Sequence, residues 1–168
     1  MEKVKGFTVI ELLVTLVVFS IFLFMVVGIS MDQVGRAGLK GSANELIGAI
    51  NTVRGKAAKE NRFVALTFTD HSYKEHSYES GTSQWSPSLG SNDTPTGTVS
   101  DGTTISDSTT IVFNSQGILV DPTTFQIRGN IKITLNSRKN DGIKIKVYSH
   151  GGIKTKNNWR GKDEYTSF

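Results

Sequence analysis

The sequence predicts an α+β fold in which a long N-terminal helix, with a membrane-spanning first half, packs on an antiparallel β-sheet or β-sandwich. Three observations predict this arrangement. Residues 12–31 form an uninterrupted run without a charged side chain. Apolar residues then continue at helical spacing to about residue 60, and segments beyond residue 62 alternate apolar and polar side chains. One long helix followed by several short strands is typical of an α+β domain.

The uncharged run is long enough to cross a membrane. At 1.5 Å per residue its 20 residues cover about 30 Å as a helix, which matches the hydrocarbon core of a bilayer. A chain this small could hardly bury a helix that is apolar on all sides, and the run is longer than the apolar region of about 7–15 residues in a secretory signal. Lys3 and Lys5 precede it, so the positive-inside rule places the short N-terminal end in the cytoplasm.

Residues 32–61 are predicted to form the amphipathic second half of the helix, with Asn61 as a stop. The apolar stripe consists of Val34, Leu39, Ala43, Leu46, Ile47, Ile50, Val53 and Ala57. Glycine is frequent in the helix, and each one costs up to about 1 kcal/mol relative to Ala. Two interpretations stay open for these glycines: close approach of neighbouring helices, or a weak helix that breaks near residues 35–41.

Residues 62–168 are predicted to form a β-rich globular domain. The expected strands cover residues 64–68, 110–113, 125–127, 131–135 and 143–147. Asn140-Asp141-Gly142 is turn chemistry, so the last two strands should form a hairpin with lysines on the solvent-exposed face.

A variable loop is expected at about residues 70–110. Between residues 80 and 110, 16 of 31 residues are Ser or Thr and none is Lys or Arg. Trp85 and Leu89 are expected to anchor this loop to the domain, although an exposed Trp would also suit contact with a partner.

The composition limits the chemistry. The 168 residues include no cysteine, which excludes disulfides and cysteine-based zinc sites. No phosphate-binding loop, dinucleotide fingerprint or nucleophile elbow occurs. His71, His76 and His150 lack metal-ligand spacing, so we expect them on the surface. The sequence therefore predicts no enzyme, no catalytic residue, no metal and no cofactor.

The N-terminal residues resemble a known processing motif. Lys5-Gly6-Phe7-Thr8-Val9-Ile10-Glu11-Leu12-Leu13-Val14 closely resembles the prepilin motif of type IV pilins and type II secretion pseudopilins. The resemblance implies that residues 1–6 are a leader peptide, cleaved between Gly6 and Phe7 by a prepilin peptidase that also N-methylates Phe7. Residues 7–31 would then be the transmembrane and filament-core helix.

Glu11 lies at the edge of the apolar run, where a carboxylate is costly in lipid and usually functional. In the resembled family, the pair formed by this Glu and a neighbour's N-terminal amine is thought to set the axial register between subunits. The simpler interpretation is that Glu11 neutralises the N-terminus of its own helix. The two roles are compatible in the assembled and free states.

Three further segments resemble the GspH/FimT branch of minor pseudopilins and pilins. They are the helix-to-strand junction at residues 57–66, the strand and turn Thr110-Ile111-Val112-Phe113-Asn114-Ser115-Gln116-Gly117, and the closing hairpin at residues 143–156. This resemblance implies a type IV pilin-like fold and a subunit that helps initiate a type II secretion pseudopilus or type IV pilus. The implied partners are the prepilin peptidase, other pilins or pseudopilins and an inner-membrane assembly platform.

The resemblance also implies a location. The chain would cross the bacterial inner membrane once, with a cytoplasmic N-terminus and a periplasmic C-terminal domain, before it enters a periplasmic or surface filament.

The net charge of +4 conceals an acidic middle and a basic end. Residues 66–125 carry one basic and seven acidic side chains, whereas residues 126–168 carry ten basic and three acidic ones. The end of the chain gathers Lys154, Lys156, Trp159, Arg160 and Lys162, which would suit phosphate contacts with a stacking aromatic.

This basic end has two interpretations. Some FimT-type minor pilins bind DNA in natural transformation through a Gly-Arg-x-Arg-like turn near this point. Here the stretch is Gly151-Gly152-Ile153-Lys154, without the first Arg. The favoured interpretation is a solvated tail that contacts an acidic face of a neighbouring subunit, with DNA binding as the alternative.

Overall fold

The computed structural model describes residues 8–89, 94–107, 109–137, 141–159 and 162–166, without the side chains of residues 26–33 and from 159 onward. The chain forms two compact units, Met1–Gly35 and Arg36–Phe168. Helix α1 (Val9–Glu60) contributes to both. All eleven described strands belong to the second unit. The α+β architecture predicted from the sequence is confirmed.

Helix α1 is continuous from Val9 to Glu60, so of the two interpretations left open for its glycines, a break near residues 35–41 does not occur. The helix ends where the sequence predicts. Asn61 adopts a positive φ of 49°, a left-handed conformation that Asn tolerates well, and the Arg62 amide donates to the carbonyl of Ala57 at 3.2 Å.

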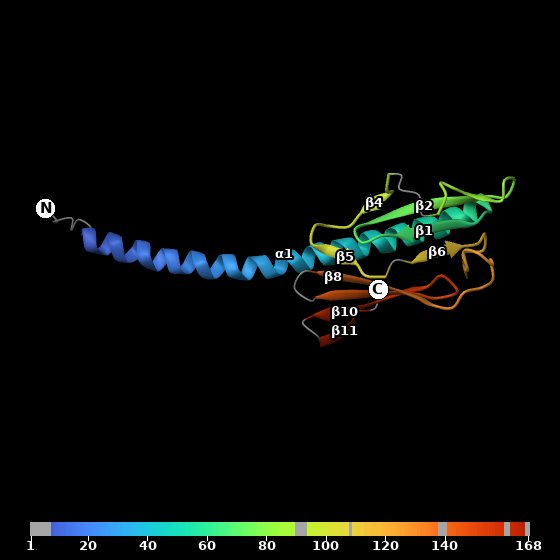
Figure 1. Ribbon diagram of the computed structural model, residues 1–168. Helices are drawn as coiled ribbons and strands as arrows, with labels where there is room; N and C mark the ends of the chain where they lie inside the picture. Colours follow the sequence, from blue (N-terminus) through green and yellow to red (C-terminus); the bar gives the residue numbers. More distant parts are fainter. Residues whose placement is uncertain (1–7, 90–93, 108, 138–140, 160–161, 167–168) are drawn as a thin grey trace. The chain divides into compact units, whose positions relative to one another are not determined.

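Two antiparallel sheets pack on the part of α1 that lies in the second unit (Figure 1). The first sheet has the order β3-β2-β1-β6-β7, with β4 also paired to β2, and the second has the order β11-β10-β9-β8-β5. The strands are β1 (Val64–Phe68), β2 (Ser72–Glu79), β3 (Gln84–Ser86), β4 (Gly97–Thr98), β5 (Thr103–Ile105), β6 (Thr110–Phe113), β7 (Leu119–Val120), β8 (Ile131–Ser137), β9 (Gly142–Val147), β10 (Ile153–Trp159) and β11 (Lys162–Thr166).

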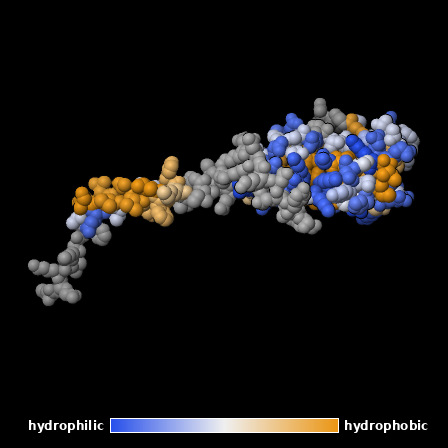
Figure 2. Space-filling view, turned by 90° about the horizontal axis from the view of Figure 1, so that it is seen from below, coloured by the Kyte–Doolittle hydropathy of each residue, from blue (hydrophilic) through white to orange (hydrophobic). Residues whose placement is uncertain are grey.

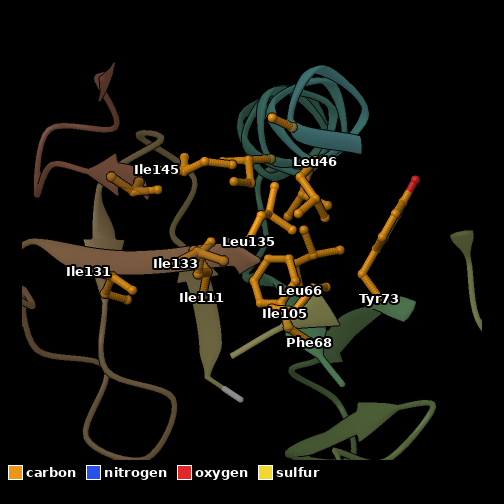
Figure 3. Packing of buried hydrophobic residues seen from close by; sticks show 14 of the residues in the cluster. Leu46, Leu66, Phe68, Tyr73, Ile105, Ile111, Ile131, Ile133, Leu135 and Ile145 are labelled. Atoms are coloured by element: carbon orange, nitrogen blue, oxygen red, sulfur yellow. The ribbon is translucent and has the colours of Figure 1, made fainter. Parts of the chain in front are cut away.

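The core lies where the helix and both sheets meet. Figure 3 shows side chains of all three elements pointing toward one another, among them Leu46 of α1, Leu66 of β1 and Leu135 of β8. Each of these is at most 1% exposed, and full burial of such a side chain is worth roughly 1.5–3 kcal/mol. The predicted helical stripe is confirmed for Leu39, Ala43, Leu46, Ile50, Val53 and Ala57, whereas Ile47 is half-buried and Val34 is exposed.

Strands β8 and β9 form the predicted hairpin. Their register pairs Ile133 with Ile145, and the Ser137 amide donates to the carbonyl of Asp141 at the turn. The Asp141 carboxylate is buried and accepts a hydrogen bond from Arg36 Nε at 3.2 Å, which joins this turn to α1. The hairpin is therefore fixed at one end by a helix residue.

Arg54 of α1 joins the helix to two further turns. Its Nη1 donates to the carbonyl of Gly151 at 3.1 Å, and its side chain lies against Gly117. Both glycines have positive φ values, 81° at Gly151 and 70° at Gly117. Glycine is required at both turns for two reasons. The backbone is left-handed there, and the Arg54 side chain occupies the space that a Cβ would need.

The segment expected to be a loop is more structured than predicted. Strands β2, β3, β4 and β5 all lie between residues 70 and 110. Conversely, the strand expected at residues 125–127 is absent: Phe125 has a φ of 55°, and only Ile127 pairs, in an isolated bridge with Val120. The Asp121 carboxylate accepts the amides of Thr123 and Thr124, which makes this segment a turn.

The expected surface position of His76 is wrong. Its side chain is 1% exposed on β2, with Nδ1 2.7 Å from the carbonyl oxygen of Pro87 and Nε2 2.8 Å from Thr67 Oγ1. A carbonyl only accepts, so Nδ1 carries a proton and donates to Pro87. The imidazole thus fastens the loop after β3 to the sheet, while His71 and His150 are exposed as expected.

Trp85 and Leu89 anchor this loop as predicted. They pack on a small cluster of Ala65, Val112 and Val120 on the face of the first sheet that points away from α1. The Trp85 ring also lies 5.2 Å from the Tyr78 ring and 6.3 Å from the Phe125 ring.

Candidate functional site

The N-terminal motif begins at residues outside the described part of the chain. Gly6 and Phe7, the predicted cleavage and methylation positions, both lie there. The described residues begin at Thr8, which immediately precedes α1, and Glu11 lies in the first turn of this helix.

Thr8 and Glu11 form a reciprocal cap. Glu11 Oε2 accepts the Thr8 amide at 3.0 Å and the Thr8 hydroxyl at 2.9 Å, while the Glu11 amide donates to Thr8 Oγ1 at 3.3 Å. This is a capping box, in which two backbone N–H groups at the start of a helix find side-chain acceptors. In the single chain Glu11 therefore serves its own helix, which is one of the two roles that the sequence leaves open.

The following segment is apolar and unpacked. Every large apolar side chain among residues 9–25 is at least 50% exposed. Figure 2 shows this segment as a hydrophobic surface. Within the part of the chain that the structure describes, no helix reaches the combined length and hydropathy required to cross a membrane.

Packing among the described residues does not explain the glycines between residues 35 and 55 of α1. A Cβ added at Gly35, Gly41, Gly48 or Gly55 would meet no atom within 4 Å, and at Gly38 it would make an ordinary contact of 3.8 Å. The helix tolerates these glycines without a break, and the space beside them is left open in the single chain.

The basic residues near the C-terminus lie on strands and not on a loose tail. Lys154 and Lys156 belong to β10, which ends at Trp159, and Lys162 begins β11. Arg160 lies outside the described residues, as do the side chains of Trp159 and Lys162. The structure therefore brings only Lys154 and Lys156 of the predicted group into a described surface.

These two lysines join three others on one face of the second sheet. The register places Lys132, Lys146 and Lys154 directly opposite one another across β8, β9 and β10, and Lys144 opposite Lys156. Side chains alternate along a strand, and the alternate positions, such as Ile133 and Ile145, are buried in the core. We call the outward surface of Lys132, Lys144, Lys146, Lys154 and Lys156 the lysine face.

An aromatic side chain borders the lysine face. The Tyr148 ring centroid lies 4.7 Å from Lys146 Nζ and 6.0 Å from Lys154 Nζ, and the ring stacks on His150 at 5.5 Å. The sequence predicts outward lysines on the β8–β9 hairpin, but the alignment of three strands and the place of Tyr148 depend on register. The alternation of Ile and Lys in the sequence is the signal that indicates a basic outer face.

Two family models match the chain. One, described as the type II transport protein GspH, matches residues 42–151, and the other, described as the prokaryotic N-terminal methylation motif, matches residues 1–27. No curated protein matches.

Among solved structures, the chain is similar to the type IV minor pilin FimU of Pseudomonas aeruginosa strain PAO1. The TM-score is 0.50 with 16% identity over 79% of this chain and 97% of that chain. A second crystal form of FimU gives a TM-score of 0.49 with 15% identity, over 77% of this chain and 100% of that chain. At this identity the first likeness shows that the fold is that of a type IV pilin.

Proposed function

The chain belongs to the GspH family of type II transport proteins, whose members are structural and not enzymatic, and we propose that it helps to initiate a periplasmic filament as a minor subunit. The observation that carries the proposal is the presence of two matches on one chain. The N-methylation motif covers residues 1–27, and the GspH domain covers residues 42–151. The filament would be a type II secretion pseudopilus or a type IV pilus.

Processing is the first proposed step. A prepilin peptidase cleaves between Gly6 and Phe7 and methylates the new amine of Phe7. The missing side chain of Gly6 leaves the scissile bond accessible to a protease at the membrane surface. The Thr8–Glu11 capping box supports this assignment, because it starts helix α1 close behind the proposed first residue of the mature chain.

The N-methylation motif of the pilin family implies anchoring in the inner membrane. We propose that residues 7–31 provide this anchor as a single span, with Lys3 and Lys5 in the cytoplasm and the strands in the periplasm. The exposed apolar side chains of residues 9–25 support this role, since they find no cover within the chain. The open space beside the glycines of α1 suits close packing against helices of other subunits.

Glu11 is proposed to exchange partners during assembly. In the single chain it is held by the hydroxyl and amide of Thr8, which are neutral donors. The methylated amine of a neighbouring subunit would carry a positive charge, so it would add an ion pair to the hydrogen bond with the Glu11 carboxylate, which Thr8 cannot provide. Such an exchange would fix the axial register between two subunits.

The experiment separates the two roles of Glu11. Glu11→Gln retains an acceptor for the capping box but removes the charge, whereas Glu11→Val removes both. Both variants should be cleaved, and both should fail to enter filaments purified from cells that supply the other subunits and the assembly platform. Normal incorporation of Glu11→Gln would contradict the proposed charge pair and leave Glu11 with the capping role alone.

A further inference from the structure

Four lysines of the lysine face, Lys132, Lys144, Lys146 and Lys154, carry charge that the described part of the chain does not neutralise. Lysines directly opposite one another on neighbouring strands repel, and Lys132, Lys146 and Lys154 form such a row across three strands. Among the described residues, no carboxylate forms an ion pair with these three lysines or with Lys144. Four cations in this arrangement, without a counter-charge among the residues that the structure describes, form a surface suited to an anion from outside.

The residue types favour a phosphate ligand over a protein partner. All five cations of the lysine face are Lys, which binds phosphate as a compact point charge and is depleted in protein–protein interfaces. A hollow of about 820 Å³ lies over this face, lined by Lys132, Lys144, Lys146, Lys154 and Lys156 together with Tyr148 and Asp107. One exposed carboxylate, that of Asp107, lies at its border.

The basic surface extends beyond this hollow. A second hollow of about 630 Å³ shares Asp107 and Lys132 with the first and adds Arg128 and Asn130. The two hollows adjoin one another at Lys132 and Asp107 and together are wider than a single small anion needs. An extended array of phosphates would cover such a surface.

Given the proposed membrane anchor, we propose that the lysine face binds the phosphate headgroups of the anionic membrane that holds the chain. Because the anchor holds the globular domain close to the membrane, the headgroups are present at a high effective concentration. Weak contacts with single headgroups are then enough to bind the domain to the surface. Lysines near an anionic bilayer are attracted to its surface. Tyrosine, such as Tyr148, is enriched in the headgroup region of membrane proteins. This contact would retain the globular domain at the membrane until a filament recruits it.

The test uses the full-length, unprocessed chain in vesicles. Because the sequence lacks cysteine, a single fluorophore can be placed by Thr134→Cys in the lysine face, or by Ser80→Cys in the exposed turn after β2. Vesicles of phosphatidylcholine, with or without phosphatidylglycerol, carry a headgroup nitroxide as quencher. We expect quenching at position 134 to increase with phosphatidylglycerol and to fall in high salt, and quenching at position 80 to remain unchanged.

A matched pair of variants assigns the effect to the lysine face. Lys146→Gln with Lys154→Gln should reduce the phosphatidylglycerol-dependent quenching roughly tenfold. Lys40→Gln with Lys59→Gln, on exposed positions of α1, removes the same charge and should leave the quenching unchanged. An equal loss of quenching in both double variants would show that the effect depends only on the net charge of the chain, and it would overturn the proposal.

Other outcomes also decide the matter. If quenching does not depend on phosphatidylglycerol although the chain floats with the vesicles, the lysine face does not bind headgroups, while the proposed anchor survives. If the same lysines bind an oligonucleotide and quenching stays unchanged, the phosphate partner is a nucleic acid and the membrane assignment is wrong. A chain that floats with neither vesicle overturns the anchor and the headgroup proposal together.

Discussion

Replacing Gly151 by Ala tests how α1 is joined to the turn between β9 and β10. Gly151 has a φ of 81°, and a Cβ there would lie 2.5 Å from Arg54 Nε and 2.7 Å from the carbonyl oxygen of Gly117. Contacts this short do not occur, so the turn or the guanidinium has to move. The Arg54 side chain can shift, but the Gly117 carbonyl belongs to another constrained turn.

Two costs make up the expected effect. A non-glycine residue in the left-handed region costs about 1–2 kcal/mol. Displacing Arg54 breaks the 3.1 Å hydrogen bond from its Nη1 to the Gly151 carbonyl, and hydrogen bonds from charged groups contribute about 1.5–3 kcal/mol. We expect Gly151→Ala to lower the free energy of unfolding by about 2.5–5 kcal/mol.

Urea unfolding of the detergent-solubilised chain, followed by circular dichroism, measures this loss. Gly48→Ala is the control, because an added Cβ meets no atom there and Ala favours a helix by up to about 1 kcal/mol. Arg54→Ala combined with Gly151→Ala should cost less than the sum of the single changes, since both remove the same hydrogen bond. A loss below about 1 kcal/mol for Gly151→Ala would refute the reasoning.

Three further changes probe the helix cap, a buried hydroxyl and a contact between α1 and the loop that joins β4 to β5. Thr8→Ala removes the capping box and should cost the start of α1 about 0.5–2 kcal/mol, seen as faster amide hydrogen exchange in its first turn. Burial, together with the hydrogen bond to Glu45, raises the pKa of Tyr73. The neutral hydroxyl therefore stabilises the fold at pH values below the pKa of an unfolded tyrosine. This stabilisation is lost as the pH rises toward the higher pKa of the folded state. Tyr73→Phe should therefore lose less stability than the parent in urea titrations between about pH 9 and about pH 11, and an equal loss would contradict the linkage. Ser42→Ala leaves the Ser100 amide without its acceptor on α1 and should lower the urea midpoint by an amount equivalent to about 1–3 kcal/mol.

Local patterns predicted the helix end and the hairpin correctly because each depends on residues close in the chain. Asn61 stops α1 by its own backbone preference, and Asp141 with Gly142 forms a turn between two strands of alternating Ile and Lys. Strand β2 was missed because both of its faces are covered. Tyr73 lies in the main core and His76 under the loop after β3, so no apolar–polar alternation is visible.

The candidate sites divide in the same way. The motif around Gly6 and Glu11 is contiguous, so its resemblance to a processing site is visible in the sequence. The lysine face depends on the register of β8, β9 and β10, which aligns Lys132 with Lys154 across 22 positions of sequence. No local sequence pattern contains that pairing. The basic residues near the C-terminus, which the sequence groups together, are divided between β10 and β11.

The most direct test of the central claim is the identity of the mature N-terminus. The chain is produced together with a prepilin peptidase and analysed by intact mass and by N-terminal sequencing. We predict the loss of residues 1–6 and an N-methylated Phe7 as the first residue, and Gly6→Leu should leave the full-length precursor. Retention of Met1 in the parent chain, or cleavage near Ser30, would contradict the account.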